Sequence, residues 1–170
     1  MHRDRIDAGR VVVIGVGNED RGDDGVGLVV ARRLSVRAPS HVRVVELGSE
    51  GSALLEVWRD ADTAMVIDAM QSGAAPGTVR RFEAQEHPLP AALFHHSTHT
   101  LGVAQHIELA RALRQLPKRL VVYAIEGRQY AMGRALTPAV ARAAGCVVEQ
   151  VVQEIGPAGS APDAEHRHGA

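Results

Sequence analysis

The chain has 170 residues, of which 45% are hydrophobic and 3% aromatic, and its formal net charge at pH 7 is -1. This length supports one well-buried core and is short for two ordinary domains. Lys118 is the sole lysine and the arginines are scattered, so the chain carries no concentrated positive charge with which to bind phosphates. We therefore expect a mixed-charge surface and no nucleic-acid partner.

Cysteine content and hydropathy bear on the compartment of the protein. Cys146 is the single cysteine, which excludes an internal disulfide, and its position in an apolar segment predicts a small buried hydrophobe. The first ten residues are polar, and no later stretch reaches the roughly 18 apolar residues of a membrane-spanning helix. These features predict a soluble, cytoplasmic protein with no membrane partner.

Strand and helix patterns alternate along the chain. Val11–Ile14 is an uninterrupted β-branched run, which is typical of a strand buried on both faces of a parallel sheet. The next segment carries Val26, Val30 and Leu34 at helical spacing. By the same criteria, strands are predicted at 11–14, 42–47, 64–69, 78–83 and 120–125, and helices at 24–37, 52–58, 101–113 and 138–154.

This alternation predicts a fold of the α/β class. Right-handed crossovers between parallel strands give a three-layer α/β/α sandwich with a mostly parallel sheet of about five strands. Residues 78–83 follow Pro76–Gly77 and are expected to form an edge strand. We expect one domain over residues 1–155 and a disordered tail over 156–170, which is rich in Gly, Pro and Ala. In such folds the ligand site lies beyond the carboxyl ends of the strands.

A glycine-rich loop, from Gly15 to Gly27, joins the first strand to the first helix and allows two interpretations. Its glycines permit a tight turn and close approach to a nucleotide, with Glu46 at the end of the second strand as a ribose-binding acid. That interpretation makes the chain a non-enzymatic nucleotide- or metal-dependent binding module. However, Asp20 replaces the third glycine of the dinucleotide fingerprint, and the acids of this loop would repel a pyrophosphate.

The acids suit a metal or water-activating site better. Carboxylates at the end of a strand face solvent, and a divalent cation would offset their mutual repulsion. Asp68 ends the apolar strand that begins at Ala64, and His99 stands at the entry to a helix, where its imidazole can coordinate a metal. Two carboxylates and one imidazole can bind a borderline divalent metal and leave positions open for water or substrate.

Three segments together resemble the hydrogenase maturation proteases. They are Gly15-Val16-Gly17-Asn18 followed by Asp23-Asp24-Gly25-Val26-Gly27, then Val66-Ile67-Asp68-Ala69, and then Ser97-Thr98-His99-Thr100-Leu101-Gly102. Their order and spacing are similar to those of the family, and the resemblance covers roughly Val11 to Glu154. It departs from the family in the segment Glu19-Asp20-Arg21-Gly22, which is more charged than in some members.

The resemblance implies an endopeptidase that makes one cut in the precursor of a nickel-iron hydrogenase large subunit and removes its C-terminal extension. It implies that Asp24, Asp68 and His99 are both the nickel ligands and the catalytic residues, and that the precursor itself supplies the nickel. The precursor is then the partner, and we expect the protease to be a monomer.

Several of these residues also have simpler interpretations. Asp23 is predicted to cap the first helix rather than to bind a metal, and Asp68 could merely end its strand. His95 and His96 are alternative candidates for metal ligands but are predicted to be exposed loop residues. Arg21 and Arg128 are candidates for contact with the substrate but are predicted to be solvated. Met65 and Met70 are predicted to lie in the core or to form the wall of a pocket.

Overall fold

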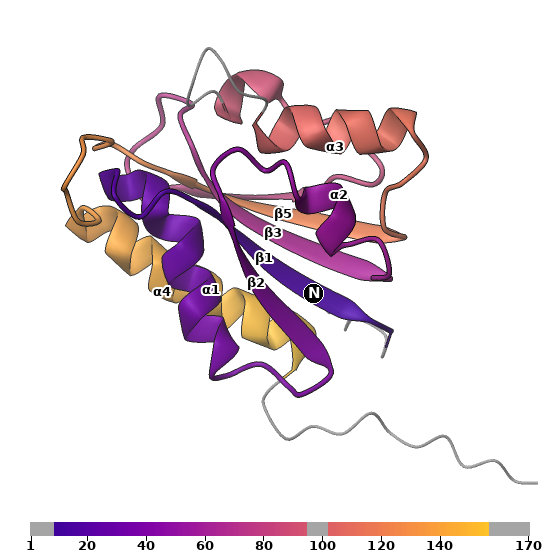
Figure 1. Ribbon diagram of the computed structural model, residues 1–170. Helices are drawn as coiled ribbons and strands as arrows, with labels where there is room; N and C mark the ends of the chain where they lie inside the picture. Colours follow the sequence, from indigo (N-terminus) through magenta and orange to yellow (C-terminus); the bar gives the residue numbers. More distant parts are fainter. Residues whose placement is uncertain (1–8, 95–101, 157–170) are drawn as a thin grey trace, which may run out of the picture.

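The computed structural model describes residues 9–94 and 102–156, which form a five-stranded sheet between two layers of helices (Figure 1). The strands are β1 (Val11–Gly17), β2 (Val42–Gly48), β3 (Thr63–Met70), β4 (Val79–Glu83) and β5 (Arg119–Glu126). The helices are α1 (Val26–Ser35), α2 (Leu54–Val57), α3 (Val103–Ala112) and α4 (Pro138–Ile155), with 3-10 turns η1 (Gly22–Gly25) and η2 (Ala91–Phe94). The predicted elements are thus confirmed, with ends shifted by a few residues.

Strand order in the sheet is β2-β1-β3-β5-β4. The first four of these strands run parallel, and β4 alone is antiparallel, paired with β5 at the edge. This arrangement confirms both the mostly parallel sheet and the edge position of residues 78–83. Helices α1 and α4 cover one face, whereas α2 and α3 cover the other, so the predicted three-layer sandwich is confirmed (Figure 1).

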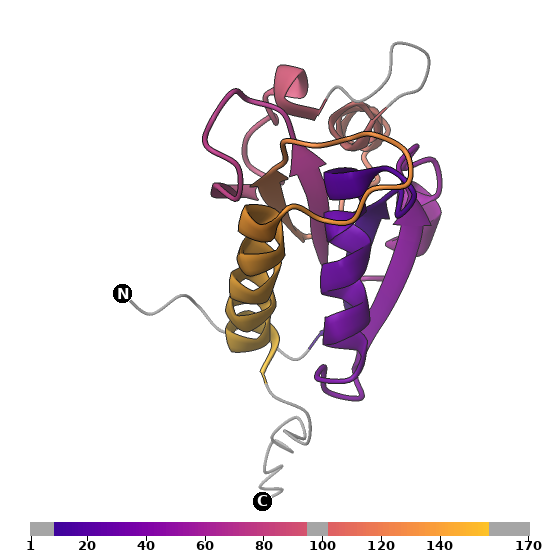
Figure 2. The same ribbon diagram turned by 90° about the vertical axis from the view of Figure 1, so that its left-hand side faces the viewer.

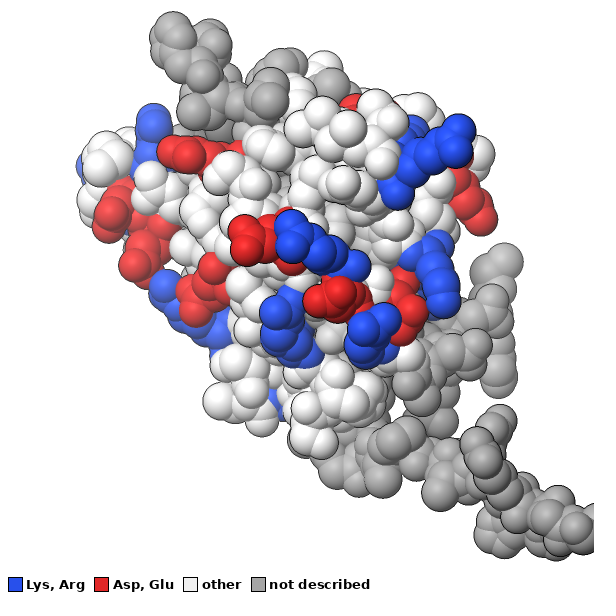
Figure 3. Space-filling model, turned by 45° about the vertical axis from the view of Figure 1, so that its right-hand side comes forward, with Lys and Arg blue, Asp and Glu red and all other residues white. Residues whose placement is uncertain are grey.

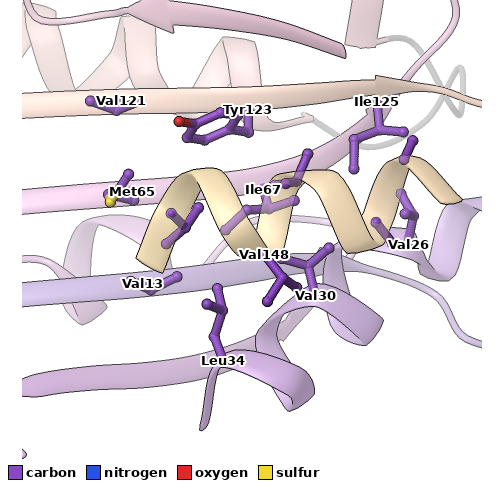
Figure 4. Packing of buried hydrophobic residues seen from close by; sticks show 14 of the residues in the cluster. Val13, Val26, Val30, Leu34, Met65, Ile67, Val121, Tyr123, Ile125 and Val148 are labelled. Atoms are coloured by element: carbon purple, nitrogen blue, oxygen red, sulfur yellow. The ribbon is translucent and has the colours of Figure 1, made fainter. Parts of the chain in front are cut away.

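Alternation along each strand divides the core into two clusters. Val11 and Val13 of β1 face α1 and α4, whereas Val12 and Ile14 face α2 and α3. Both sets are buried, which explains why a central parallel strand is apolar throughout instead of alternating with polar residues. Figure 4 shows the first cluster, in which Val30 and Leu34 of α1 and Val148 of α4 pack against the sheet.

Cys146 corrects one prediction, because its side chain is exposed and not buried. The apolar stripe of α4 runs through Ala144, Val147, Val148 and Val151, all of which face the sheet. At 100° per residue, position 146 lies on the opposite side of the helix from this stripe. The exposure of Cys146 is therefore determined by its position around the helix axis and not by the apolar residues next to it in the sequence.

Surface charge is mixed, as the composition predicts. In the view of Figure 3, acidic and basic side chains alternate over the same face, and neither sign forms a continuous area. Oppositely charged neighbours also pair: Arg32 lies 2.7 Å from Glu19 and 2.8 Å from Glu46. Ion pairs of this exposed kind contribute little to stability.

A buried ionic contact joins the last turn of α4 to the edge strand. Glu154 is 3% exposed and accepts hydrogen bonds from Nε and Nη2 of Arg81 in β4, both at 2.9 Å, and from the hydroxyl of Tyr123 in β5. Because the pair is bidentate and shielded from water, it fixes the position of α4 across β5 and β4.

We predict that Glu154→Ala lowers the free energy of unfolding by about 3 kcal/mol, because the Arg81 guanidinium and the Tyr123 hydroxyl lose their buried acceptor. Urea unfolding followed by circular dichroism measures the change. Glu149→Ala, in the same helix, is the matched control: its exposed pair with Arg37 should contribute less than about 1 kcal/mol. Equal losses in both variants would contradict this account.

Candidate functional site

The carboxyl ends of β1 and β3 form the point at which the chain switches direction in the sheet. From β1 the chain first crosses to β2 on one side, and β3 then pairs on the other side of β1. Crevices at such switch points are where open α/β sheets bind their ligands. Figure 2 views this edge of the sheet, with η1 and the loop after β5 nearest the reader.

The glycines of the first loop allow the main chain of this region to pack without side chains between its segments. A Cβ atom on Gly15 would lie 2.1 Å from the carbonyl oxygen of Gly27, and one on Gly17 would lie 2.1 Å from that of Asp24. A Cβ on Gly27 would lie 2.3 Å from the oxygen of Val16. All three distances are far inside van der Waals contact. These glycines therefore allow η1 and α1 to contact the sheet, and they are not needed for a pyrophosphate to approach the main chain.

Asp24 and Asp68 are both buried at this edge. Asp24 lies in η1 and is 4% exposed, and Asp68 lies in β3 and is 3% exposed. Asn18 N–H donates to the carbonyl oxygen of Asp24 at 3.2 Å, which folds η1 back on the end of β1. Ala69 N–H donates to Oδ1 of Asp68 at 2.8 Å. The two sequence-predicted carboxylates are therefore held by separate elements at one rim of the sheet.

The two carboxyl groups lie close enough for the charge of one to affect the other. Burial raises the pKa of the Asp68 carboxyl well above its usual range, and the charge of Asp24 raises that pKa further. The hydrogen bond from Ala69 N–H opposes these two effects but is smaller. A pair of buried, mutually repelling carboxylates is an arrangement that a cation would stabilise.

Asp23 corrects a second prediction, because its side chain makes no helix cap. Its Oδ2 accepts hydrogen bonds from the N–H groups of Arg128 and Gln129, both at 2.9 Å. Its Oδ1 accepts one from Thr137 N–H at 2.7 Å, and the Thr137 hydroxyl also binds this carboxylate. Asp23 thus connects η1 to the loop between β5 and α4, a role that local sequence could not reveal because the partners lie more than 100 positions away.

Glu126 is a buried acid that the sequence analysis missed. It ends β5, is 3% exposed, and accepts hydrogen bonds from Ser72 N–H at 2.9 Å, the Ser72 hydroxyl at 2.6 Å and Gly73 N–H at 3.2 Å. The signal was available, since an acid that closes an apolar strand is the same pattern that identified Asp68. Here the acid holds the loop after β3 in place.

The predicted histidines His95, His96 and His99 lie outside the described residues. The chain on both sides of them is described. Leu93 accepts a hydrogen bond from Gln71 N–H at 2.8 Å, three positions after Asp68. A Cβ on Gly102 would lie 3.0 Å from the carbonyl oxygen of Phe94, so the two residues that flank segment 95–101 lie close together. Within residues 9–94 and 102–156, no group of three or more His, Cys, Asp or Glu side chains is arranged to hold a metal.

A pocket of about 640 Å³ opens beside the site, between the carboxyl ends of β1 and β2. Glu46, the candidate ribose-binding acid, is among its lining residues, but its carboxylate pairs with Arg32. The N–H groups of Asp23 and Asp24 donate to Gln129 and Arg21 carbonyls, so they are not directed toward a phosphate. These contacts remove the support for the nucleotide interpretation.

Similarity to known proteins agrees with the geometry. The model of the hydrogenase maturation protease family HycI matches residues 28–154. The chain belongs to the hydrogenase maturation protease family. The match contains Asp68 and the position of His99, and it begins four residues after Asp24.

Relatives of this maturation protease include named proteins of several bacteria. Hydrogenase 2 maturation protease of Escherichia coli is 30% identical over 148 residues, covering 84% of this chain and 88% of that one. Hydrogenase expression/formation protein HupD of Rhodobacter capsulatus is 28% identical and the match spans 86% and 71% of the two chains. Some HupD relatives are longer: the chain spans 53% of the one from Thiocapsa roseopersicina.

Among solved structures, the hydrogenase maturating endopeptidase HybD from E. coli superposes with a TM-score of 0.74 at 28% identity, covering 88% of this chain and 95% of that one. The maturation protease described here is accordingly an endopeptidase that processes the C-terminus of a nickel-iron hydrogenase large subunit. No helix in the described part of the chain is both long and apolar enough to span a membrane.

The remaining residues singled out from sequence fall into two groups. Met65 and Met70 are fully buried, which confirms their place in the core. Arg21 and Arg128 are exposed, as predicted, although Nε of Arg21 also reaches the carbonyl oxygen of Tyr130 at 3.5 Å.

We predict that Asp68→Asn stabilises the metal-free protease at neutral pH by on the order of 1 kcal/mol. The pKa of Asp68 is higher in the folded state than in the unfolded state. Below the unfolded-state pKa the carboxyl is protonated in both states and does not lower the free energy of unfolding. As pH rises from there toward the folded-state pKa, the carboxyl lowers the free energy of unfolding increasingly. The gain should therefore be small at pH 4 and larger at pH 8 in urea unfolding. Asn keeps the acceptor for Ala69 N–H. A gain independent of pH would contradict the burial argument, and exposed Asp20→Asn is the control.

We predict that Asp23→Ala lowers the free energy of unfolding by about 3 kcal/mol, because three backbone N–H groups and the Thr137 hydroxyl lose one acceptor. Hydrogen exchange should accelerate at Arg128, Gln129 and Thr137 more than in the sheet. Asp20→Ala, three positions earlier and exposed, should change neither quantity. Unchanged exchange at all three amides in Asp23→Ala would refute the tethering role.

Proposed function

We propose that this maturation protease cuts the large-subunit precursor once, after nickel insertion, and that Asp24, Asp68 and His99 bind the nickel of the precursor during the cut. The precursor supplies the nickel, so the metal belongs to the substrate. The observation that carries the proposal is the pair of buried, electrostatically coupled carboxylates Asp24 and Asp68 at the switch point of the sheet.

The chemistry of these two groups supports a cation as their ligand. Carboxylates taken out of water need a compensating charge, and burial together with the charge of Asp24 raises the pKa of Asp68. A divalent cation beside both groups would favour their ionised forms. Two carboxylates with one imidazole form a set of ligands suited to a borderline metal such as nickel.

Chain connectivity supports His99 as the third ligand. His99 is three positions before Gly102, and three residues of chain span at most about 11 Å. Gly102 precedes α3, which packs on the same face of the sheet to which Val66 and Met70 of β3 contribute. Asp68, two positions from each of these, shares their strand phase. Asp68 and the start of α3 therefore belong to the same side of the sheet, which supports the proposal for His99.

The proposed reaction is hydrolysis of one peptide bond. The oxygen of a water molecule bonds to the carbonyl carbon, the carbon–nitrogen bond breaks, and the released amine takes up a proton. Nickel polarises a carbonyl or a water molecule beside it. The contribution of Asp24, Asp68 and His99 is to fix the metal-bearing segment of the precursor so that the bond to be cut is held in one position.

The setting of this reaction is part of the same proposal. The enzyme works as a monomer in the cytoplasm on the large-subunit precursor. Support comes from the single cysteine, which suits a reducing compartment, and from the mixed surface charge.

The test combines purified protein with nickel-loaded, tail-bearing large subunit, and follows loss of one C-terminal peptide by mass spectrometry. We expect cleavage by the wild type and a decrease of more than about 100-fold in Asp24→Ala, Asp68→Ala and His99→Ala, because each removes a metal ligand. Circular dichroism establishes that each variant is folded.

Matched controls come from the same edge of the sheet. Asp20→Ala and Glu50→Ala remove exposed carboxylates that line the neighbouring pocket and should cleave at close to the wild-type rate. Full activity in any of the three ligand variants would exclude that residue from the site. Cleavage of nickel-free precursor at the same rate would overturn the role of the metal.

A further inference from the structure

The loop between β5 and α4, residues 127–137, has no regular secondary structure, yet its main chain is fixed at several points. Gly127 N–H donates to the Met70 carbonyl at 3.1 Å, and the Asp23 carboxylate binds the N–H groups near both ends of the loop. Asp23 N–H in turn donates to the carbonyl oxygen of Gln129 at 2.7 Å. The loop is therefore ordered before any partner binds.

The central part of this loop is attached to the residues that precede Asp24. Gly133 N–H donates to the Asp20 carbonyl at 2.8 Å, and Gly22 N–H donates to that of Arg134 at 3.1 Å. A Cβ on Gly22 would lie 2.3 Å from the Gln129 oxygen, so the two segments are in direct backbone contact. Figure 2 shows the orange loop crossing in front of η1.

An exposed methionine stands at the tip of this fixed loop. Met132 is 67% exposed and precedes Gly133, which has a φ of 70° and turns the chain back. The described residues contain three other exposed large apolar side chains, and of these Val36 follows the last turn of α1 while Leu109 and Leu113 lie near the end of α3. Met132 alone among the four belongs to a loop bonded to η1.

Two arginines belong to the same loop as Met132, a third pairs with one of them in the backbone, and exposed Asp20 is bonded to the loop through its carbonyl oxygen. Arg21, Arg128 and Arg134 are exposed, and none of them forms an ion pair with any part of the chain that the structure describes. Arg21 and Arg134 are bridge partners in the backbone, so their positions are fixed relative to each other. We call Met132 with these three arginines the Met132 patch.

We infer that the Met132 patch is the surface on which the large-subunit precursor docks, with Met132 entering an apolar depression of the precursor that is flanked by carboxylates. This inference rests on the proposed function. It adds a contact that binds the substrate without touching the bond that is cut.

Three features of the patch favour a protein partner at this place. A preorganised loop loses little conformational freedom on binding, so more of the contact energy appears as affinity. Methionine adapts its shape to an apolar partner, and methionine and arginine are both enriched at protein interfaces. Because the loop is bonded to Asp20, Gly22 and Asp23, a precursor held by the patch also stands at the rim that carries Asp24.

The test measures steady-state cleavage of nickel-loaded precursor, and separately its binding to immobilised protease. We expect Met132→Glu to raise KM and the dissociation constant by roughly 10-fold or more, with kcat within about 2-fold of the wild type. Met132→Leu should stay within about 3-fold in both. Arg134→Glu should weaken binding and reduce its dependence on salt.

Val36→Glu is the control, since it places the same charge at an exposed apolar residue away from the site. An unchanged KM and dissociation constant in Met132→Glu would overturn the inference while cleavage by the wild type continued. A different outcome is possible: the wild type binds the precursor without cutting it, and Met132→Glu no longer binds it. This outcome would refute the proposed function and retain the docking surface.

Discussion

Direct backbone contact between the start of the first helix and the ends of β1 and β3 determines where the acidic residues at this edge of the sheet lie. The contact exists because Gly15, Gly17 and Gly27 have no side chains, and a methyl group at any of them would overlap a carbonyl oxygen. It places η1 directly on the strand ends. Asp24 consequently lies where its charge affects Asp68, although 44 positions of chain separate them. Neither carboxylate could be buried beside the other if the helix began further from the sheet.

The acids at this rim have different tasks, and hydrogen bonding distinguishes them. Asp23 and Glu126 each accept several backbone N–H groups, so both carboxylates are occupied in holding loops. Asp68 accepts one backbone hydrogen bond and is left with a raised pKa, which is costly for stability and typical of groups that act on a ligand. This difference between Asp68 and the two acids that hold loops supports the proposed cation site.

Much of the fold could be predicted from the sequence because its signals are local. Runs such as Val11–Ile14 identified the buried strands, and the spacing of Val26, Val30 and Leu34 identified a helix. Asp68 was found because it follows such an apolar run, although the strand continues to Met70 in the structure. The roles of Asp23 and Glu126 could not be predicted, since their partners are backbone amides of distant loops. Cys146 was misjudged because composition was weighed above helical phase. The position of His99 relative to both carboxylates remains a prediction.

The bonds between Asp23 and Thr137 join parts of the chain that are 114 positions apart. Residue 23 leaves the ribosome long before residue 137. While most of the protein is being synthesised, the Asp23 carboxylate therefore lacks the N–H groups that it binds in the folded protein. Truncated or stalled chains that end before residue 127 would therefore contain both Asp24 and Asp68 and still lack the backbone N–H groups that bind the Asp23 carboxylate. Completion of the site is tied to completion of synthesis.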